Sequence, residues 1–400
     1  MRLEPIVTSL LDTDFYKFNM NQLIFHKYKD INGEYHFKCR NNDVAFTSEM
    51  LQEINEQIDF LCTLSFKKDE LDYLRNISFI KDDYVDFLST LKLNRDYVNC
   101  SINENNNLIC IVKGPCYLAM HFEIYLLEII NEVYFRFKYN YEELFQSAKI
   151  RLQEKINKFN NGSYTFSFAE FGCRRRLSLQ WQDYMVKEFV TKTKNCVGTS
   201  NVYLAKKYHV KPIGTFAHEL VQMYQGIEGI SILNNNKVAL EDWYEEYQGA
   251  NGTALTDTLT TDLFLKVFDY TNATRYSGVR HDSGNPYDWG NKIIAHYKSL
   301  NINPQEKTLL FSDGLDFDKA QALYNYFKNQ IKVSFGIGTY CSNDTKVPPL
   351  NIVLKLQKIN GKPVAKLSDV EGKTMCLDDQ YLKWLKKEVQ MCLRRRQNEK

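Results

Sequence analysis

The chain has 400 residues, 44% hydrophobic and 25% charged, which is typical of a globular protein with one large domain or two to three smaller ones. Its 51 basic and 49 acidic residues nearly cancel and leave a formal net charge of +2. This balance excludes the long-range field that would favour nucleic acid as a partner, and no local basic patch indicates one.

The ten cysteines are scattered along the chain, and none forms a Cys-x-x-Cys pair. This spacing argues against a zinc site or a redox pair, so we expect reduced thiols in a cytoplasmic protein. Residues 1–5 contain no apolar signal core. The most apolar predicted helix, 116–137, is interrupted by His121, Glu123, Glu128 and Glu132, so we expect it to be buried in the protein and not to span a membrane.

In chain order, residues 1–140 predict a mixed lobe of helices and strands. Asp12 and Asp14 resemble a helix cap before an apolar stripe, which predicts an amphipathic first helix over 13–26. Tyr16 and Lys17 fall outside that stripe, and the residues alone do not distinguish a solvated pair from a functional one. Further strands are expected at 34–40 and 108–112, and helices at 46–61, 68–75, 82–91 and within 116–160.

From residue 164 onward, short apolar runs alternate with helical segments, as in parallel α/β folds. The strands expected from this pattern are 165–169, 210–215, 237–240, 253–255, 276–279, 307–311 and the run that begins at 332. After them, 352–357 and 364–367 predict a hairpin that turns at Asn360-Gly361, and a basic helix is expected from Asp378.

The strand that begins at 332 leads into Gly336 and Gly338, which are followed by Thr339. Glycines at alternate positions leave backbone N–H groups bare, which suits a phosphate group. An ordinary turn explains two such glycines more often than a binding loop does, and Cys341 stands where a dinucleotide fingerprint needs a third glycine. Other predicted strands also end in glycine and polar residues, and this repetition strengthens the interpretation as a binding loop.

Polar side chains follow two upstream strands as well, as Arg280 to Asp282 and as Ser312 to Gly314. A parallel barrel gathers the ends of its strands at one face, where barrel enzymes keep their sites. Hydroxyl, arginine and glycine groups suit phosphate, and carboxylates suit Mg²⁺ or ribose hydroxyls. The sequence therefore predicts a phosphosugar or nucleotide substrate.

Phe171 and Gly172 precede the three arginines 174–176. Consecutive arginines are more often a solvated turn than a site. An aromatic ring beside guanidinium groups, however, binds a flat anion by stacking and by bidentate contacts, so we interpret Phe171 and Arg174 as ligand-binding residues.

Two weaker signals each exclude a type of site and assign no function. His218-Glu219 resembles half of a zinc-protease helix, but Gln222 replaces the second histidine, and a lone histidine near a helix start is usually structural. Lys373 lies in a Gly-Lys-Thr triplet, but Leu367 stands where a Walker loop needs glycine. Any ATP would have to be held by another kind of site.

Taken together, the motifs make the chain resemble the nicotinate phosphoribosyltransferases of the bacterial and fungal type. The resemblance is carried, in one order along nearly the whole chain, by residues 11–17, 171–176, 198–201, 214–219, 254–257, 280–284, 311–313, 335–339 and 361–368.

This resemblance implies transfer of phosphoribose from phosphoribosyl pyrophosphate to nicotinate, coupled to ATP hydrolysis, with Mg²⁺ and in a homodimer. It also implies an α/β fold in which an irregular, TIM-like barrel over 141–345 carries the active site. Beside the barrel we expect a mixed lobe of residues 1–140, to which residues 346–400 return.

The resemblance also assigns roles to individual residues. It points to His218 as a phosphorylated histidine, against its structural interpretation, and to Tyr16 of a neighbouring subunit and Phe171 as the rings that enclose the pyridine, with Arg174 beside them. His218, Asp282 and Asp313 are the expected catalytic residues, and Asp282 and Asp257 the expected metal ligands. Further substrate contacts are expected at Thr199, Ser200, Arg280, Ser312, Gly314, Gly336, Gly338 and Thr339.

One departure from the family pattern is Asn285, where relatives commonly have aspartate. A carboxylate lost there could weaken Mg²⁺ binding. Two alternatives remain open from the sequence: a nicotinamide-specific phosphoribosyltransferase, and a catalytically inactive relative that binds a nucleotide.

Overall fold

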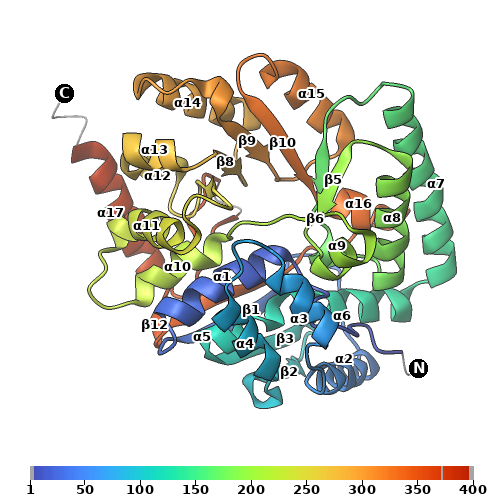
Figure 1. Ribbon diagram of the computed structural model, residues 1–400. Helices are drawn as coiled ribbons and strands as arrows, with labels where there is room; N and C mark the ends of the chain where they lie inside the picture. Colours follow the sequence, from blue (N-terminus) through green and yellow to red (C-terminus); the bar gives the residue numbers. More distant parts are fainter. Residues whose placement is uncertain (1–3, 371–372, 396–400) are drawn as a thin grey trace.

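The computed structural model describes residues 4–370 and 373–395 and contains two β-sheets (Figure 1). Five strands form an antiparallel sheet: β1 (Asn32–Cys39), β2 (Val98–Ile102), β3 (Leu108–Pro115), β11 (Ile352–Ile359) and β12 (Lys362–Pro363). Seven strands form a parallel sheet: β4 (Phe168–Glu170), β5 (Cys196–Thr199), β6 (Lys211–Pro212), β7 (Thr253–Leu255), β8 (Gly278–His281), β9 (Thr308–Phe311) and β10 (Lys332–Ile337).

The helices divide between the same two parts of the molecule. Those of the first 140 residues are α1 (Phe15–Lys27), α2 (Ser48–Leu61), α3 (Lys68–Arg75), α4 (Asp82–Thr90), α5 (Cys116–Ala119) and α6 (Phe122–Lys138). Those that follow are α7 (Tyr141–Asn160), α8 (Leu179–Lys192), α9 (Val202–Tyr208), α10 (His218–Met223), α11 (Asn235–Tyr247), α12 (Thr261–Val267), α13 (Tyr270–Arg275), α14 (Pro286–Ser299), α15 (Phe317–Phe327), α16 (Thr339–Ser342) and α17 (Asp379–Arg395). Short 3-10 turns are η1 (Arg95–Tyr97), η2 (Cys173–Arg175), η3 (Tyr224–Gly226), η4 (Ile232–Asn234) and η5 (Pro304–Glu306).

The antiparallel sheet has the strand order β12-β11-β1-β3-β2 and joins distant parts of the chain. β1 pairs on one side with β3 and on the other with β11, where Cys39 lies opposite Ile352. At the other end of this pair, the Asn360 side chain accepts a hydrogen bond from the Asn32 backbone N–H at 2.8 Å. Residues 352–363 thereby extend a sheet that residues 32–39 and 98–115 begin.

The parallel sheet has the order β6-β5-β4-β10-β9-β8-β7, with every neighbouring pair parallel. Helices α7, α8, α14 and α15 surround it (Figure 1). This confirms the predicted parallel α/β architecture. Within the described residues the edge strands β6 and β7 do not pair with each other, so the sheet is curled and open, and a closed TIM-like barrel stays a prediction.

Two expectations about secondary structure were wrong, and the first concerns the helix at the start of the chain. The first helix, α1, is buried on every side from Phe15 to Ile24 and is not amphipathic. Asp14 occupies its N-cap position, but its side chain accepts no capping hydrogen bond and instead accepts one from Ser200 at 2.5 Å. Lys17 is likewise buried, between Glu123 at 2.7 Å and Glu219 at 2.5 Å, which rules out the solvated Tyr16-Lys17 pair.

The segment 237–240, expected to be a strand, lies inside α11. Ala239, Leu240, Trp243 and Tyr247 of this helix are buried, and their spacing places them on one helical face. A four-residue apolar run is compatible with either structure, and the wider helical spacing decides. Strand β2, by contrast, was missed, although its apolar residues Val98, Cys100 and Ile102 alternate with polar ones as in a strand.

The predicted burial of the apolar helix is confirmed, since Glu123, Glu128 and Glu132 of α6 all lie in the interior. Glu123 contacts Lys17, and Glu128 contacts Arg176 at 3.2 Å. These contacts explain how a helix can carry buried carboxylates. Within residues 4–370 and 373–395, no helix combines the length and the apolar character that crossing a bilayer requires.

Candidate active site

A cavity of about 710 Å³ lies where strands of the parallel sheet end and residues 349–370 and 373–375 cross over them. Phe171 follows β4, Asp282 follows β8, Ser312 follows β9 and Gly338 follows β10, so parallel strands bring these residues together. The predicted site residues that line the cavity are Phe171, Arg174, His218, Arg280, Asp282, Ser312, Asp313, Gly314, Gly336, Gly338 and Thr339.

Four predicted site residues lie behind this lining. Thr199 and Ser200 are buried, and their hydroxyl groups donate to the carboxylates of Glu170 and Asp14. Asp257 is buried beside His218, and the Tyr16 hydroxyl accepts a hydrogen bond from Arg174 of its own chain. The geometry gives the Thr199 and Ser200 side chains a position behind the lining, and their contact with a substrate stays a prediction.

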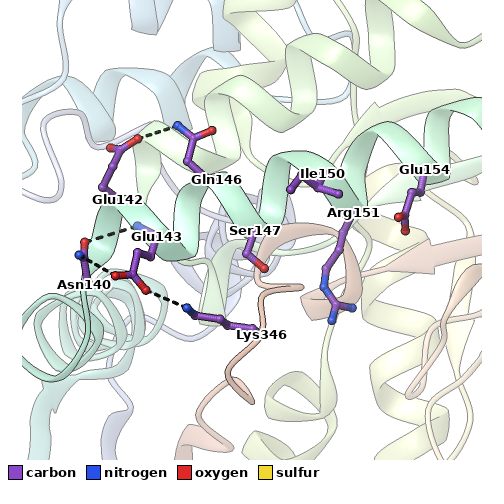
Figure 2. Close-up of a pocket in the computed structure, with 9 residues that line it drawn as sticks. All are labelled: Asn140, Glu142, Glu143, Gln146, Ser147, Ile150, Arg151, Glu154 and Lys346. Carbon is purple, nitrogen blue, oxygen red and sulfur yellow. Dashed lines mark hydrogen bonds and ion pairs between the residues drawn. The ribbon is translucent and has the colours of Figure 1, made fainter.

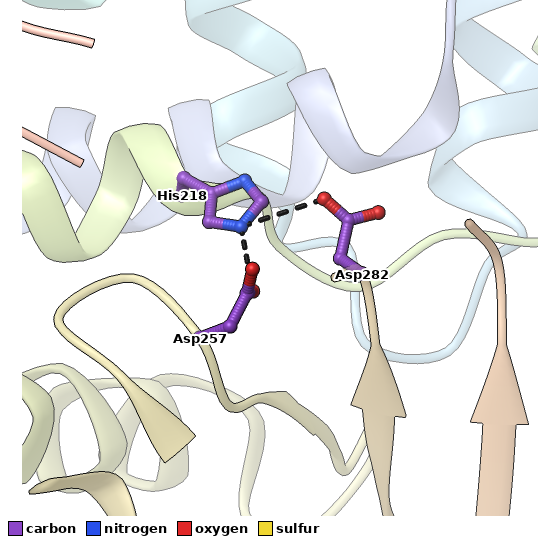
Figure 3. A group of neighbouring side chains, drawn as sticks. All are labelled: His218, Asp257 and Asp282. Carbon is purple, nitrogen blue, oxygen red and sulfur yellow. Dashed lines mark hydrogen bonds and ion pairs between the residues drawn. The ribbon is translucent and has the colours of Figure 1, made fainter. Parts of the chain in front are cut away.

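His218, Asp257 and Asp282 form a close group at the cavity wall (Figure 3). His218 begins α10, and its Nε2 atom lies 2.8 Å from Asp257 Oδ1 and 3.5 Å from Asp282 Oδ2. Both carboxylates therefore face the same ring nitrogen, and Nδ1 is the nitrogen that neither engages (Figure 3).

The protonation states of this group follow from burial and from Lys366. Burial, assisted by the Lys366 ammonium, lowers the pKa of His218 to about 4, so the imidazole is neutral at neutral pH. Burial alone would raise the pKa of Asp257, but His218 and Lys366, whose ammonium lies 3.2 Å from Asp257 Oδ2, hold it well below its usual range. A neutral ring donates Nε2–H to the ionised Asp257 and keeps the Nδ1 lone pair.

The two carboxylates differ as ligands for Mg²⁺. Asp257 Oδ1 contacts His218, while Oδ2 accepts hydrogen bonds from Ser283 at 2.5 Å and Ser368 at 3.3 Å. A carboxylate so fully engaged has little capacity left for a cation, although Asp257 lies in one group with His218 and Asp282 whose ligand atoms are close enough to share a metal ion, so metal binding by Asp257 stays a prediction. The Asp282 side chain is 28% exposed and that of Asp313 29%, and both face the cavity, so they fit an oxygen-binding cation better.

Cations cluster at the opposite end of the cavity, near Phe171. Burial and the neighbouring Arg174 and Arg40 lower the pKa of Arg175 to about 10. Burial also lowers the pKa of Lys355 to about 8, although Glu123 lies 3.2 Å from its ammonium. Depressed pKa values on buried basic groups show that the cost of burying their positive charge is not fully compensated within the protein, and an anionic ligand would compensate it.

Sequence reasoning missed two lysines of the crossing segment. Lys366 lies beside Asp257, and the Lys373 ammonium contacts Asp313 and donates to the Asp282 carbonyl at 2.7 Å. A hydrogen bond of 2.9 Å from Leu367 N–H to the Thr258 carbonyl fixes this segment beside the sheet. The sequence singled out Lys373 only in the Gly-Lys-Thr triplet, where a Walker loop was excluded.

A second hollow of similar size, about 690 Å³, lies on the outer surface of α7 (Figure 2). Its walls come mainly from one helix, and its ion pair, Lys346 with Glu143 at 2.8 Å, is solvent-exposed. Exposed pairs of this kind contribute little, and no strand end reaches the hollow in the part of the chain that is described. Chemistry, not size, therefore singles out the cavity at the strand ends.

Comparison with known proteins identifies the family of the chain. The model of the nicotinate phosphoribosyltransferase (NAPRTase) family matches residues 166–392, and that of the NAPRTase N-terminal domain matches residues 11–131. The chain belongs to the nicotinate phosphoribosyltransferase family. Residues 132–165 between the two matches include the end of α6 and all of α7.

Relatives of the family match over nearly the whole chain. The nicotinate phosphoribosyltransferase of Acinetobacter baylyi is 44% identical over 98% of both chains, and that of Chromobacterium violaceum is 45% identical over 96% of both. Crystal structures of nicotinate phosphoribosyltransferases from Porphyromonas gingivalis and Vibrio cholerae each superpose with a TM-score of 0.89. They are 32% and 35% identical and cover 96% and 99% of this chain and 100% of their own.

Asn285, the departure from the family pattern, is the N-cap of α14. Its side chain accepts hydrogen bonds from the backbone N–H groups of Tyr287 at 2.9 Å and Asp288 at 3.2 Å. Asparagine and aspartate serve equally well in this position. The substitution therefore preserves the helix start.

Proposed function

We propose that this protein transfers the phosphoribosyl group of phosphoribosyl pyrophosphate to the ring nitrogen of nicotinate. The products are nicotinate mononucleotide, a precursor in NAD biosynthesis, and pyrophosphate. The observation that carries the proposal is one cavity whose lining combines an aromatic ring, Phe171, with the cations Arg174, Arg175 and Lys355, while Asp282 and Asp313 line the ends of the neighbouring strands. Family membership supports the same assignment.

The reaction breaks the bond between the anomeric carbon and the pyrophosphate oxygen and forms a bond from that carbon to the pyridine nitrogen. The nitrogen already has a lone pair, so no base has to remove a proton. Asp282 and Asp313 therefore act by position and charge: they face a developing positive charge on the ribose and accept hydrogen bonds from its hydroxyls. Mg²⁺ bound at these carboxylates would supply positive charge for the departing pyrophosphate.

ATP coupling through His218 is part of the proposal. The neutral imidazole keeps the Nδ1 lone pair because Asp257 holds the proton on Nε2. Attack by Nδ1 on the γ-phosphorus forms the N–P bond, breaks the P–O bond to ADP and requires no proton transfer from that nitrogen. Asp257 then stabilises the positive charge that develops on the ring.

Preference for nicotinate over nicotinamide follows from the charge near Phe171. Arg174, Arg175 and Lys355 line the cavity there, and a carboxylate forms stronger, charge-assisted hydrogen bonds with such groups than a neutral amide does. This contrast favours nicotinate over the nicotinamide-specific alternative.

One assay tests the whole proposal. Purified protein with phosphoribosyl pyrophosphate, nicotinate and Mg²⁺ should release pyrophosphate, faster with ATP than without it and far more slowly when nicotinamide replaces nicotinate. Efficient use of nicotinamide would support the alternative specificity. Binding of phosphoribosyl pyrophosphate without any pyrophosphate release would support the inactive relative.

The family also motivates proposals about the assembly and the larger organisation of the molecule. We infer a homodimer in the cytoplasm. We infer, further, that the curled sheet works as an irregular barrel within residues 141–345, beside a lobe formed by residues 1–140 and 346–400. The pairing of β1 with β11 supports this division.

A further inference from the structure

Glu170, the last residue of β4, is an ionisable side chain that the proposed mechanism does not use. It is fully buried, and within the described residues it forms no ion pair. Its Oε1 atom accepts a hydrogen bond from the Gly172 backbone N–H at 2.6 Å, and Oε2 accepts one from the Thr199 hydroxyl at 2.6 Å. Gln182 Nε2 donates to both oxygens, at 3.1 and 3.2 Å. Burying a carboxylate without a cation is costly, which calls for a reason.

The turn that Glu170 contacts is fixed from several other directions. The Phe171 backbone N–H donates to the Ile337 carbonyl at 2.9 Å, and the Gly172 carbonyl accepts from Ser342 Oγ at 2.8 Å. A Cβ atom at Gly336 would overlap the Phe171 ring, and one at Gly338 would lie 2.9 Å from the Phe171 carbonyl oxygen. These contacts hold the backbone of Phe171 and Gly172, and the Phe171 ring packs closely against the two glycines of β10 and its end.

We propose that Glu170 is a positioning residue for nicotinate: its carboxylate holds the Gly172 N–H and thereby fixes the Phe171 ring against which the pyridine stacks. This inference rests on the proposed function of the cavity. Glu170 itself does not line that cavity among the described residues, so it acts through the turn and not through contact with a substrate.

Protonation of Glu170 should loosen the turn. Gly172 N–H and Gln182 Nε2 can only donate, so a proton on a carboxyl oxygen leaves fewer acceptors for them. Burial raises the pKa of Glu170 to about 7 even though Thr199 and Gln182 stabilise the charged form, which places the change near neutral pH. The titratable groups that face it are Asp14 before α1, Cys173 of η2, Cys196 of β5 and Cys341 of α16, with Arg176 beyond Gln182.

The first experiment measures KM and kcat against pH for the native enzyme and for Glu170→Gln. In the native enzyme, KM for nicotinate should rise as pH falls through about 7, because the carboxylate is then lost. In Glu170→Gln it should be about tenfold higher at high pH and should not rise further as pH falls through about 7, with kcat and KM for phosphoribosyl pyrophosphate changed much less. A nicotinate KM with native size and native pH dependence in this variant would overturn the proposal.

Thr199→Val provides a matched variant and keeps the proposal testable if Glu170→Gln does not fold. It removes one donor to the carboxylate but leaves Gly172 in contact, so the pKa of Glu170 should rise. The rise in nicotinate KM should then begin at a higher pH than in the native enzyme. A purely structural role for Glu170 predicts no such shift, and an unchanged profile would overturn the proposal.

Backbone hydrogen exchange of residues 171–174 tests the same contact without any activity. After correction for intrinsic rates, protection of the Gly172 amide should fall in the native protein below about pH 7 and should be low at every pH in Glu170→Gln. Protection that is equal in the two proteins would refute the role of Glu170. If the native protein releases no pyrophosphate at all, the proposed function fails, and this measurement still decides whether Glu170 holds the turn.

Discussion

Gly336 and Gly338 illustrate how one residue pattern can have two physical causes. We predicted a phosphate cradle from their bare N–H groups, and both residues do line the cavity. The structure adds a packing reason, because side chains at these positions would collide with Phe171. Phosphate binding by these glycines stays a prediction. The two causes predict effects of substitution on different substrates.

Gly336→Ala separates these causes. A methyl group would displace the Phe171 ring, so KM for nicotinate should rise by about tenfold, consistent with loss of a stacking contact of about 1 kcal/mol and some ordering of the ring. KM for phosphoribosyl pyrophosphate should change less. Initial-rate measurements with each substrate varied provide the comparison, and an increase confined to phosphoribosyl pyrophosphate would favour the cradle alone.

The pKa of His218 makes a prediction about stability. Because this pKa is about 4 in the folded protein and about 6.5 in an unfolded chain, the unfolded chain binds the proton first as pH falls. His218 should therefore cost the protein up to about 3 kcal/mol of unfolding free energy as pH drops from about 6.5 to about 4. Urea denaturation of the native protein and of His218→Gln across this range measures the difference. A difference between the two proteins that does not vary with pH would contradict the prediction.

At the residue scale, the sequence located the strand-end residues but not the direction of each side chain. Phe171, Asp282 and Ser312 could be predicted because each follows an apolar run, and parallel strands carry such residues to one face. Thr199 is the last residue of a strand, β5, but its hydroxyl donates to Glu170. Lys366 could not be predicted, because its place beside Asp257 depends on contacts between residues more than 100 positions apart.

At the scale of elements, helices with clear caps or long apolar stripes were predicted well. The expected helices 68–75 and 82–91 correspond to α3 and α4. Errors arose where tertiary burial overrides local pattern, as in α1, which is enclosed on all sides, and in α11, where four apolar residues resembled a strand. Hydrophobic periodicity and residue propensity indicate the type of an element. They do not show how many of its faces other parts of the protein bury.

The hairpin of β2 and β3 carries a testable pair of cysteines. Cys100 and Cys110 lie directly opposite each other in the two strands, with their sulfur atoms 2.6 Å apart, and both are free thiols. Treatment with a mild disulfide oxidant should join them, lowering the mass by two hydrogens and stabilising the protein by about 3 kcal/mol through the short closed loop. Intact mass and thermal denaturation, with Cys100→Ser as the control, measure both effects. Oxidation that gives only dimers linked through other cysteines would contradict this pairing.

At the scale of the whole molecule, the decisive contacts join residues far apart in sequence. β1 pairs with β11, and Lys17 of α1 contacts Glu219 of α10. No periodicity within one segment predicts such partners. The return of the chain to its first lobe was implied by family resemblance, and the boundaries 140 and 345 stay predictions, particularly since α17 packs against α12 of the larger part.

Tyr16 connects the site to the predicted homodimer. It lies beside Arg174 of its own chain, and its contribution to a neighbouring subunit stays a prediction. Removing the ring in Tyr16→Ala should weaken nicotinate binding through loss of a stacking contact of about 1 kcal/mol, with little effect on phosphoribosyl pyrophosphate. Steady-state KM values for the two substrates measure this selectivity.

Mixing two damaged chains tests which subunit Tyr16 serves. If it completes the neighbour's site, a heterodimer of Tyr16→Ala and His218→Ala chains has one intact site, because the undamaged Tyr16 and the undamaged His218 then meet. At nicotinate concentrations far below KM, where Tyr16→Ala homodimers are only weakly active, random exchange should add about a quarter of the native ATP-coupled activity. A mixture of Phe171→Ala with His218→Ala is the matched control, since both residues line the same chain's cavity and no intact site can form. Recovery in neither mixture, with subunit exchange demonstrated by differently tagged chains, would assign Tyr16 to the site of its own subunit, where Arg174 already holds its hydroxyl.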